Sequence, residues 1–374
     1  MTILGRSCHT QSSRWYPPEC FEQAGKQPIV QPYSASATHS QLSRDIAVAV
    51  LGTGSIGIRH LRVLRDLVRV PVSAIPVREM RRSALEKDGF QVHKTLKEAV
   101  DAGIRTVVVA TDTARHLRDL RSALSHGCFA LVEKPLAVNA EGFQEVRELI
   151  ECALQRVYVA CDLRFDPSLL EFRRRLPQIG AVHAVRITCQ SYLPGWRPDR
   201  DYRQSYSARA AEGGVLLDLI HEVDYAVWLF GTPARVFGRL TNLGRLGIES
   251  EEIADLYWET PNKAGVSIHL DYLTRTPHRK MQAFGECGEI EWDGVAQSVS
   301  FELNGGGRKR DWFPRERDAI LREQDTAFLR ATEGSDPATL ATFEDGAVAV
   351  SICDAARVSS VTGKFEAVMD WRRR

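Results

Sequence analysis

Lys134 is the residue whose type and position point most directly to chemistry. It stands in the segment Glu133-Lys134-Pro135, directly after the apolar run 129–132. A lysine at the carboxyl end of a parallel strand points into the crevice where such sheets bind ligands. From there its ammonium group could hydrogen-bond a substrate hydroxyl, assist its deprotonation and stabilise the developing oxyanion. The alternative is a surface lysine after a strand, and only proximity to a cofactor separates the two interpretations.

A second group of polar residues falls at helical spacing in an apolar segment. Asp218, His221, Asp224 and Tyr225 lie along one side of a helix predicted over about 214–230. His221 is the natural proton donor or acceptor near neutral pH, and Asp218 could orient it or contact a substrate hydroxyl. The alternative is a histidine whose nitrogens are satisfied inside a domain interface. No metal is expected, because the zinc motif H-E-x-x-H would need a second histidine where Tyr225 stands.

Glycines at fixed spacing follow the first candidate strand. The run 46–51 is continuously apolar, and Gly52-Thr53-Gly54-Ser55-Ile56-Gly57 comes directly after it and opens a helix. Gly52 permits a tight turn, Gly54 lets the backbone approach a pyrophosphate, and Gly57 lets the helix pack closely on the strand. The N–H groups and the positive dipole end of that helix would bind the phosphates. The loop therefore predicts a dinucleotide cofactor, with all six of its residues in the binding site.

The position that usually distinguishes NAD from NADP lacks a carboxylate. An Asp or Glu for the ribose 2′-hydroxyl should end the second strand, and Val77 occupies that position. Arg78 follows, and a guanidinium group there favours a cofactor that carries a 2′-phosphate. Glu79 could still bond the ribose if the register differs by two residues. The sequence therefore leaves both NADP and NAD open.

Between the lysine and histidine motifs, the segment 192–209 is dense in aromatic residues, arginine and aspartate. Trp196, Arg197 and Tyr202 are its candidate substrate-binding residues. Arginine pairs with phosphate or carboxylate groups, and aromatic rings stack on sugar faces. The alternative is a loop that contacts a partner subunit, and the sequence favours neither interpretation.

The elements that must position these residues follow from hydrophobic periodicity. The first half of the chain predicts a doubly wound parallel sheet (a Rossmann fold), with strands at 46–51, 72–75, 106–110, 129–132 and 157–160 and helices that include 113–126 and about 139–154. The second half predicts an α+β domain with a largely antiparallel sheet, built from the helix 214–230, extended segments at 234–241, 252–259, 264–274, 279–285 and 289–293, and a last helix over about 343–359. The expected domains are a flexible extension over 1–44, a Rossmann domain over 45–163, and a substrate-binding and oligomerisation domain over 164–374.

Composition excludes several classes of protein. The chain has 374 residues, 44% of them hydrophobic, so it is long enough for two domains with a substantial core. Its 49 basic and 48 acidic residues nearly balance. The chain therefore lacks the excess of positive charge that is typical of a nucleic-acid-binding protein. No apolar run is long enough to span a bilayer. Eight scattered cysteines without a C-x-x-C pair indicate reduced thiols and a cytoplasmic protein.

Five motifs in this order resemble the glucose–fructose oxidoreductase and inositol dehydrogenase family (Gfo/Idh/MocA). They are G-T-G-S-I-G at 52–57, A-T-D-T-A-R-H at 110–116, V-E-K-P at 132–135, L-R-F-D-P at 163–167 and G-G-V-L-L-D-L-I-H-E-V-D-Y at 213–225. The resemblance covers about residues 45–365. It implies a nucleotide-binding domain followed by an α/β domain with an open-faced sheet, which often joins copies of the chain into a homo-dimer or homo-tetramer.

The resemblance also assigns roles to individual residues. It makes Lys134 and His221 catalytic, with Asp218 as a partner, although the family often places this aspartate four residues before the histidine and here it stands three before. Thr111 and His116 match the family segment that lines the cofactor path, with Asp112 in place of its proline.

The predicted function is an NAD(P)-dependent oxidoreductase that transfers a hydride between the nicotinamide and a carbinol carbon of a sugar, a cyclitol or a sugar nucleotide. We expect Glu133 to contact the cofactor and Arg164 to contact the substrate. Two alternatives remain open at this point. One is a non-catalytic dinucleotide sensor on the same fold, and the other is a reductase of a keto sugar, an imine or a tetrapyrrole.

Overall fold

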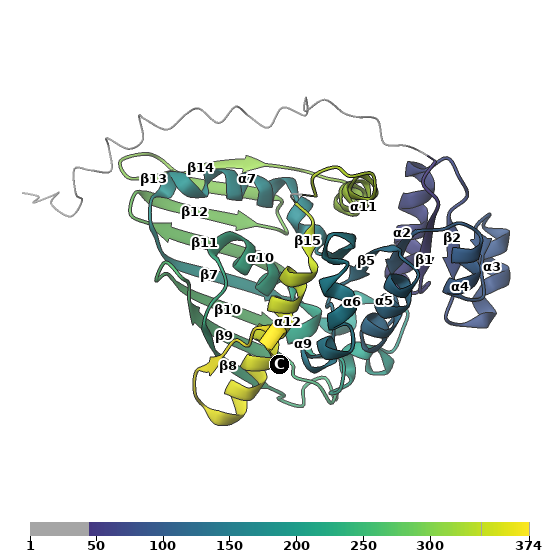
Figure 1. Cartoon of the computed structure of the whole chain (residues 1–374). Helices are drawn as coiled ribbons and strands as arrows, with labels where there is room; N and C mark the ends of the chain where they lie inside the picture. The colour runs from purple at the N-terminus through teal and green to yellow at the C-terminus, as the bar shows by residue number, and fades with distance from the viewer. Residues whose placement is uncertain (1–44, 338, 374) are drawn as a thin grey trace, which may run out of the picture. The chain divides into compact units, whose positions relative to one another are not determined.

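The parallel strands predicted from the first half of the chain form one sheet. A computed structural model describes residues 45–337 and 339–373, so the extension expected over 1–44 lies outside the described residues. Seven strands make up this first sheet in the order β15-β6-β5-β4-β1-β2-β3 (Figure 1). Their bounds are β1 Val48–Leu51, β2 Ser73–Ile75, β3 Gln91–Val92, β4 Thr106–Val109, β5 Phe129–Glu133, β6 Val157–Ala160 and β15 Ala341–Thr342.

The strand order confirms the doubly wound fold. β3-β2-β1-β4-β5-β6 are parallel neighbours, which is the order of a dinucleotide-binding sheet whose winding reverses between β1 and β4. Every residue of β1 and β4 is buried, because these strands lie at the centre of the sheet and helices cover both faces. The helices of this half are α2 Ser55–Leu67, α3 Arg82–Lys87, α4 Leu96–Asp101, α5 His116–Ser125 and α6 Arg147–Glu151.

One helix of this half is shorter than predicted. In place of a helix over 139–154, a 3-10 segment covers Glu141–Glu145 and α6 covers only Arg147–Glu151. No side chain caps the start of the 3-10 segment, and Gly142 in its first turn has a low helical propensity. The predicted start of this helix at Asn139 is therefore wrong by two residues.

The second half of the chain forms a nine-stranded sheet in the order β14-β13-β12-β11-β7-β10-β9-β8-β16. Its neighbouring strands are antiparallel except for β7 and β10, which confirms a largely antiparallel sheet. The bounds are β7 Val182–Gln190, β8 Arg235–Thr241, β9 Ile253–Glu259, β10 Gly265–Asp271, β11 His278–Gly285, β12 Gly288–Asp293, β13 Ser298–Leu303, β14 Lys309–Trp312 and β16 Glu366–Ala367.

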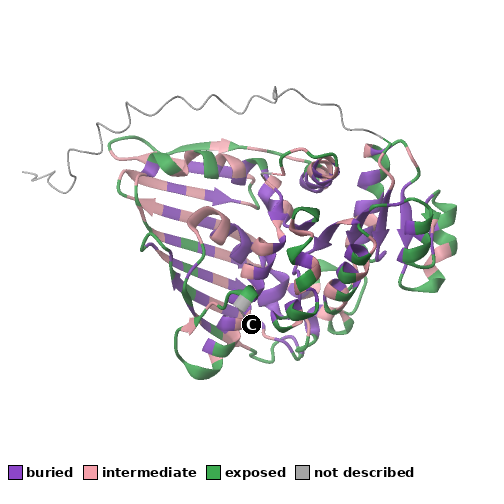
Figure 2. Ribbon diagram, in the orientation of Figure 1, coloured by how far each residue is buried: buried purple, intermediate pink, exposed green. Residues whose placement is uncertain are grey.

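Helices pack on one face of this sheet. α7 Pro167–Arg175, α10 His221–Phe230 and α12 Phe343–Thr362 lie against β12, β7 and β8 (Figure 1). The strands accordingly alternate between buried and more exposed residues (Figure 2). Two short helices, α8 Leu193–Trp196 and α9 Val215–Asp218, precede α10. Among the described residues no helix is both long enough and apolar enough to cross a membrane.

The boundary expected at residue 163 does not divide the chain into two contiguous domains. Helix α11 (Ala319–Thr332) packs against α2, and β15 pairs with β6 at the edge of the parallel sheet. Phe328 and Leu329 of α11 belong to the same buried cluster as Leu61 and Leu64 of α2. The segment 319–342 therefore returns to the first sheet. In the structure, the domain predicted over 164–374 does not include this segment.

The helix predicted over 214–230 is two helices. α9 ends at Asp218 and α10 begins at His221. At the break, the N–H of Glu222 donates to the carbonyl of Leu219 rather than to that of Asp218. The carbonyl oxygen of Asp218 is therefore not used by the helix, which hydrophobic periodicity alone could not reveal.

Arg164 is an interior residue, which corrects its predicted role in substrate binding. It is 2% exposed, and its guanidinium group donates to both carboxylate oxygens of Asp224 at 2.7 and 3.0 Å. A third nitrogen donates to Asp345 at 3.2 Å, at the start of α12. Because Asp224 is itself buried, the pair serves to neutralise charge between the two halves of the fold.

We expect Arg164→Met to cost about 3–5 kcal/mol of unfolding free energy, because it leaves the Asp224 carboxylate buried without a counter-charge. The double variant Arg164→Met with Asp224→Leu should recover much of that loss. Urea unfolding of the three proteins measures both effects. An Arg164→Met protein as stable as the wild type would contradict the structural role.

A second buried ion network joins α2, β5 and α11. His60 is fully buried, with Nδ1 2.9 Å from Asp325 and Nε2 2.9 Å from Glu133. Burial opposes a charged imidazole, but the two carboxylates outweigh it and raise the pKa of His60 to about 10. His60 is therefore a cation that ties α11 to the residue before Lys134.

The charge of His60 makes part of the stability dependent on pH. Its pKa rises from 6.5 to about 10 on folding, so its contribution is complete below about pH 6.5 and is lost as the pH rises to about 10. We expect His60→Gln to unfold at a lower temperature than the wild type at neutral pH, with a difference that shrinks towards pH 10. Thermal unfolding followed by circular dichroism measures this difference. A gap that stays constant with pH would show that His60 is not charged in the folded protein.

Candidate active site

The glycine loop has the geometry that its spacing predicts. Gly52 adopts a φ of 97°, where a side chain would also collide with the backbone of Ala110. A Cβ on Gly57 would collide with the carbonyl of Gly52, so the helix can approach the strand only with glycine there. Gly54 is the N-cap of α2, where no side chain caps the helix and no acidic residue stands in the first turn. The first N–H groups of α2 are therefore available to an anion.

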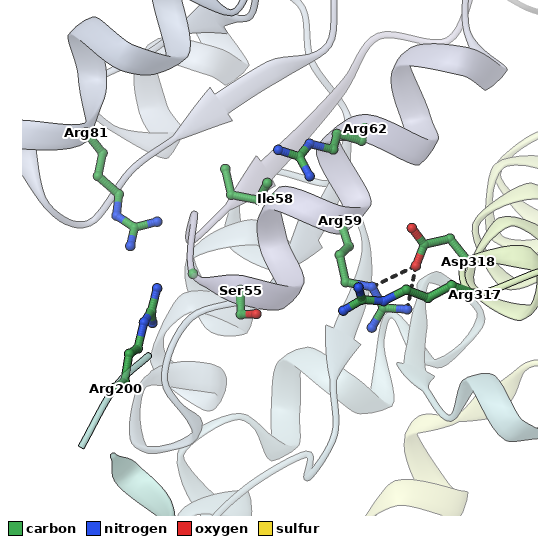
Figure 3. Close-up of a pocket in the computed structure, with 9 residues that line it drawn as sticks. Ser55, Ile58, Arg59, Arg62, Arg81, Arg200, Arg317 and Asp318 are labelled. Atoms are coloured by element: carbon green, nitrogen blue, oxygen red, sulfur yellow. Dashed lines mark hydrogen bonds and ion pairs between the residues drawn. The ribbon is translucent and has the colours of Figure 1, made fainter. Parts of the chain in front are cut away.

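A pocket of about 310 Å³ opens at this end of α2 (Figure 3). Gly54, Ser55 and Ile58 of the loop and helix line it together with five arginines and one aspartate: Arg59, Arg62, Arg81, Arg200, Arg317 and Asp318. The remaining predicted loop residues play supporting parts. Thr53 is buried and its carbonyl accepts a hydrogen bond from Arg81, while Ile56 packs against the core.

The arginine that reaches the glycine loop is not the predicted one. Arg78 is exposed and lies outside the residues that line the pocket. Arg81, three residues later, donates to the carbonyl of Thr53 and lines the pocket. A 3-10 turn over Glu79–Arg81 directs the chain back towards the loop, and the sequence carries no signal that distinguishes these neighbouring arginines.

The ends of β4 and β5 form the floor next to the loop. The hydroxyl of Thr111 is buried and has no hydrogen-bond partner among the described residues. His116 is buried, and its two ring nitrogens face the carbonyl oxygens of Pro135 and Thr111 at 2.8 and 2.9 Å. Glu133 is paired with His60. His116 and Glu133 therefore hold the two strand ends in place, and their predicted contact with a cofactor stays a prediction.

These features fit a dinucleotide. The uncapped helix start, the open space beside Gly54 and the unpartnered hydroxyl of Thr111 lie along the carboxyl edge of the parallel strands. That edge is where doubly wound sheets bind nucleotides. Among the described residues, no group of three histidine, cysteine or acidic side chains is arranged to hold a metal ion.

Lys134 extends from the end of β5 to the second half of the chain. Its Nζ donates to the carbonyl oxygen of Asp218 at 2.6 Å, the carbonyl that the break between α9 and α10 leaves without a helical partner. The peptide bond to Pro135 is cis. The predicted catalytic residues Lys134 and Asp218 are thus brought together, through the backbone of Asp218 rather than through its carboxylate.

Two tyrosines surround the carboxylate of Asp218. Tyr272 donates to Oδ2 at 2.5 Å, while Oδ1 is buried without a partner among the described residues. The charge of Asp218, together with burial and a hydrogen bond to Asp218, raises the pKa of Tyr206 well above its usual value. Burial and the same carboxylate raise the pKa of Tyr272. Both hydroxyls therefore stay protonated and are donors to Asp218.

His221 begins α10 and faces a carboxylate that sequence reasoning missed. Its Nε2 lies 3.6 Å from Oδ1 of Asp162, and its Nδ1 is buried without a partner among the described residues. Burial and the positive charges of Lys134 and Arg279 hold the pKa of His221 well below its usual value. Burial and the negative charge of Glu133 raise the pKa of Asp162 to about 6, against the opposing effect of Lys134 and two arginines.

Asp162 could have been found by the rule that identified Lys134. It stands two residues after β6, just as Lys134 directly follows β5, so both occupy the carboxyl edge of the sheet. At neutral pH the arrangement sets a neutral imidazole beside an ionised carboxylate. A pair of this kind can take up and pass on a proton.

The predicted substrate-binding residues lie on the segment that leads to α9. Trp196 is 39% exposed, donates to Ser191 and packs edge-on against the ring of Tyr272, with the ring centres 5.4 Å apart. Arg197 is exposed and its charge acts on Tyr206. Tyr202 is half-buried and its hydroxyl donates to the carbonyl of Leu246, so it anchors the segment.

Comparison with known proteins finds relatives named as inositol dehydrogenases. The inositol 2-dehydrogenase of Streptomyces avermitilis is 29% identical over 206 residues, which are 51% of this chain and 54% of that protein. The chain thus spans little more than half the length of that relative. An inositol 2-dehydrogenase/D-chiro-inositol 3-dehydrogenase of Shouchella clausii is 25% identical over 86% of this chain and 94% of its own.

The fold and the family models extend the similarity to both halves. A levoglucosan dehydrogenase in complex with NADH and L-sorbose superposes with a TM-score of 0.76 at 18% identity, over 87% of this chain and 99% of that chain. The model described as "Oxidoreductase family, NAD-binding Rossmann fold" matches residues 46–161, and the "GFO/IDH/MocA C-terminal domain" matches residues 177–291. The chain therefore belongs to the Gfo/Idh/MocA family of oxidoreductases.

Proposed function

We propose that this protein transfers a hydride between a nicotinamide dinucleotide and a carbinol carbon of a sugar, a cyclitol or a sugar nucleotide. The observation that carries the proposal is the hydrogen bond of Lys134 to Asp218. It holds an ammonium group close enough for its charge to lower the pKa of His221, at the same sheet edge as the glycine loop. The relatives named for inositol oxidation and the neighbour with NADH and L-sorbose support the substrate class.

The cofactor, when bound, accepts or supplies the hydride. The residues suited to hold it are the glycine loop, whose free N–H groups suit the diphosphate, and Thr111, whose hydroxyl has no partner in the described part of the chain. These groups are fixed before binding, because Gly52 and Gly57 pack backbone against backbone.

Lys134 is suited to act on the substrate oxygen. An ammonium group has three donors, and Asp218 takes one of them. The remaining donors can bind the oxygen of the reacting carbinol and stabilise the negative charge that develops there as its proton leaves. The backbone contact aims the ammonium group without neutralising its charge.

His221 and Asp162 are suited to handle that proton. His221 is neutral at physiological pH, because burial and nearby positive charges lower its pKa, and it can accept a proton from the hydroxyl. Asp162 lies 3.6 Å away and is partly exposed, so it can stabilise the imidazolium and connect it to solvent. Oδ1 of Asp218, which no described residue contacts by a hydrogen bond, can accept from a further substrate hydroxyl, and the ring of Trp196 is a surface for a sugar face.

We expect Lys134→Ala to lower turnover by about a hundredfold to ten-thousandfold while dinucleotide affinity changes by less than about threefold. The assay offers myo-inositol, monosaccharides and nucleotide sugars with NAD⁺ and NADP⁺ and follows nicotinamide absorbance. The matched control is Lys97→Ala, a lysine on the exposed side of α4. Near-normal turnover by the Lys134→Ala protein would contradict the role of this lysine.

The oxidation rate should fall as the pH drops through about 6, because Asp162 titrates there and its protonated form no longer stabilises an imidazolium on His221. Asp162→Asn should give a rate lower by about tenfold to a hundredfold with no inflection near pH 6. The measurement is the pH profile of kcat/KM for both proteins. An inflection near pH 6 that persists in the variant assigns the titration to another group.

A further inference from the structure

The arginine pocket at the glycine loop carries more positive charge than the diphosphate of a dinucleotide needs. Five guanidinium groups and one carboxylate line it, an excess of four positive charges. Only Arg59 has a carboxylate partner among the described residues, Asp318, with nitrogen and oxygen 2.7 Å apart. The diphosphate supplies about two negative charges, and a phosphate monoester adds about 1.5 to 2 more at neutral pH.

Two of these arginines oppose one another. Arg81 and Arg200 point towards the same space beside Ser55 (Figure 3). Arg81 is fixed by its hydrogen bond to the carbonyl of Thr53. Neither guanidinium group has a carboxylate partner among the described residues, because Asp318, which also lines the pocket, pairs with Arg59. Two positive charges that share a pocket repel one another, and an anion bound between them would remove this repulsion.

The residues that follow β2 also favour a phosphate group on the ribose of the cofactor. Val77, which stands where a carboxylate would bind a ribose 2′-hydroxyl, is 48% exposed, and its side chain offers no hydrogen bond to a ribose. A carboxylate there would also repel a 2′-phosphate, and its absence removes that obstacle.

Arg200 brings the second half of the chain into this pocket. It lies on the segment between α8 and α9, four residues after Trp196. Trp196 packs on Tyr272, and Tyr272 donates to Asp218 in the candidate active site. One continuous segment therefore joins the cofactor pocket to the residues expected to bind substrate.

We propose that Arg81 and Arg200 together bind the 2′-phosphate of NADP(H), and that this contact anchors the segment 196–206 over the candidate active site. The inference rests on the proposed function, because it assumes a dinucleotide on the glycine loop. It assigns the preference for NADP to two residues from different halves of the chain. Cofactor binding then prepares the substrate site, since the anchored segment carries Trp196 and Arg197.

The test is fluorescence titration of the full chain with NADPH and with NADH. We expect the wild type to bind NADPH at least about tenfold more tightly than NADH. Arg81→Gln and Arg200→Gln should each weaken NADPH binding by about tenfold to a hundredfold and change NADH binding by less than about threefold. Adenosine 2′,5′-diphosphate should compete with NADPH in the wild type and lose that ability in both variants.

The matched control is Arg203→Gln. Arg203 stands on the same segment, but it stacks on the ring of Tyr202 at 4.8 Å and does not line the pocket. This variant should bind both dinucleotides as the wild type does. If Arg203→Gln weakened NADPH binding as much as Arg200→Gln, the loss would reflect the net charge of the segment rather than a specific contact. That result would overturn the proposed site.

Hydrogen–deuterium exchange tests the anchoring. NADPH should slow exchange over 196–206 in the wild type and in Arg203→Gln, but not in Arg200→Gln. Unchanged exchange in the wild type at saturating NADPH would overturn the anchoring.

The remaining outcomes separate this inference from the proposed function. Equal binding of NADH and NADPH by the wild type, or an equal loss of both in Arg200→Gln, would assign the arginines to the diphosphate and overturn the inference while the proposed function stands. Failure of the wild type to bind either dinucleotide would overturn both.

Discussion

The hydrogen bond from Lys134 to the carbonyl of Asp218 is the contact on which the candidate active site depends. It joins the end of a parallel strand to the second half of the fold, and it exists because a helix is interrupted. An unbroken helix would use that carbonyl for its own ladder and leave the lysine without this partner. The same interruption places His221 at the start of α10, opposite Asp162. Local backbone geometry thus sets the distance between the groups that are suited to bind and deprotonate a hydroxyl.

Charge is distributed differently inside the fold and at its cofactor edge. In the interior, Arg164 is matched by Asp224 and His60 is matched by Asp325 and Glu133. These pairs neutralise groups that could not be buried alone, and they hold the strand ends that carry the site. In the pocket beside α2, by contrast, four arginines lack a carboxylate partner among the described residues. Such an imbalance at a helix start suits an anionic ligand rather than stability.

Much of this architecture could be predicted from the sequence, because glycine spacing and buried strands are local signals. The loop 52–57 and the parallel strand order follow from them directly. The break after Asp218 could not be predicted, because the segment shows unbroken helical periodicity and nothing local marks the carbonyl that Lys134 binds. Arg164 was misassigned for a related reason: a charged residue next to a sheet edge can face either a ligand or a buried carboxylate, and composition does not distinguish them.

If the glycine loop and Lys134 belong to one dinucleotide site, a bound dinucleotide shields the lysine from solvent. Reductive methylation of lysines, read by mass spectrometry with and without saturating NADPH, tests it without a known substrate. Bound dinucleotide should slow the modification of Lys134 several-fold and leave Lys97, which lies exposed on α4, unchanged. Equal modification of Lys134 in the free and the dinucleotide-bound protein would separate the lysine from the cofactor and contradict the account.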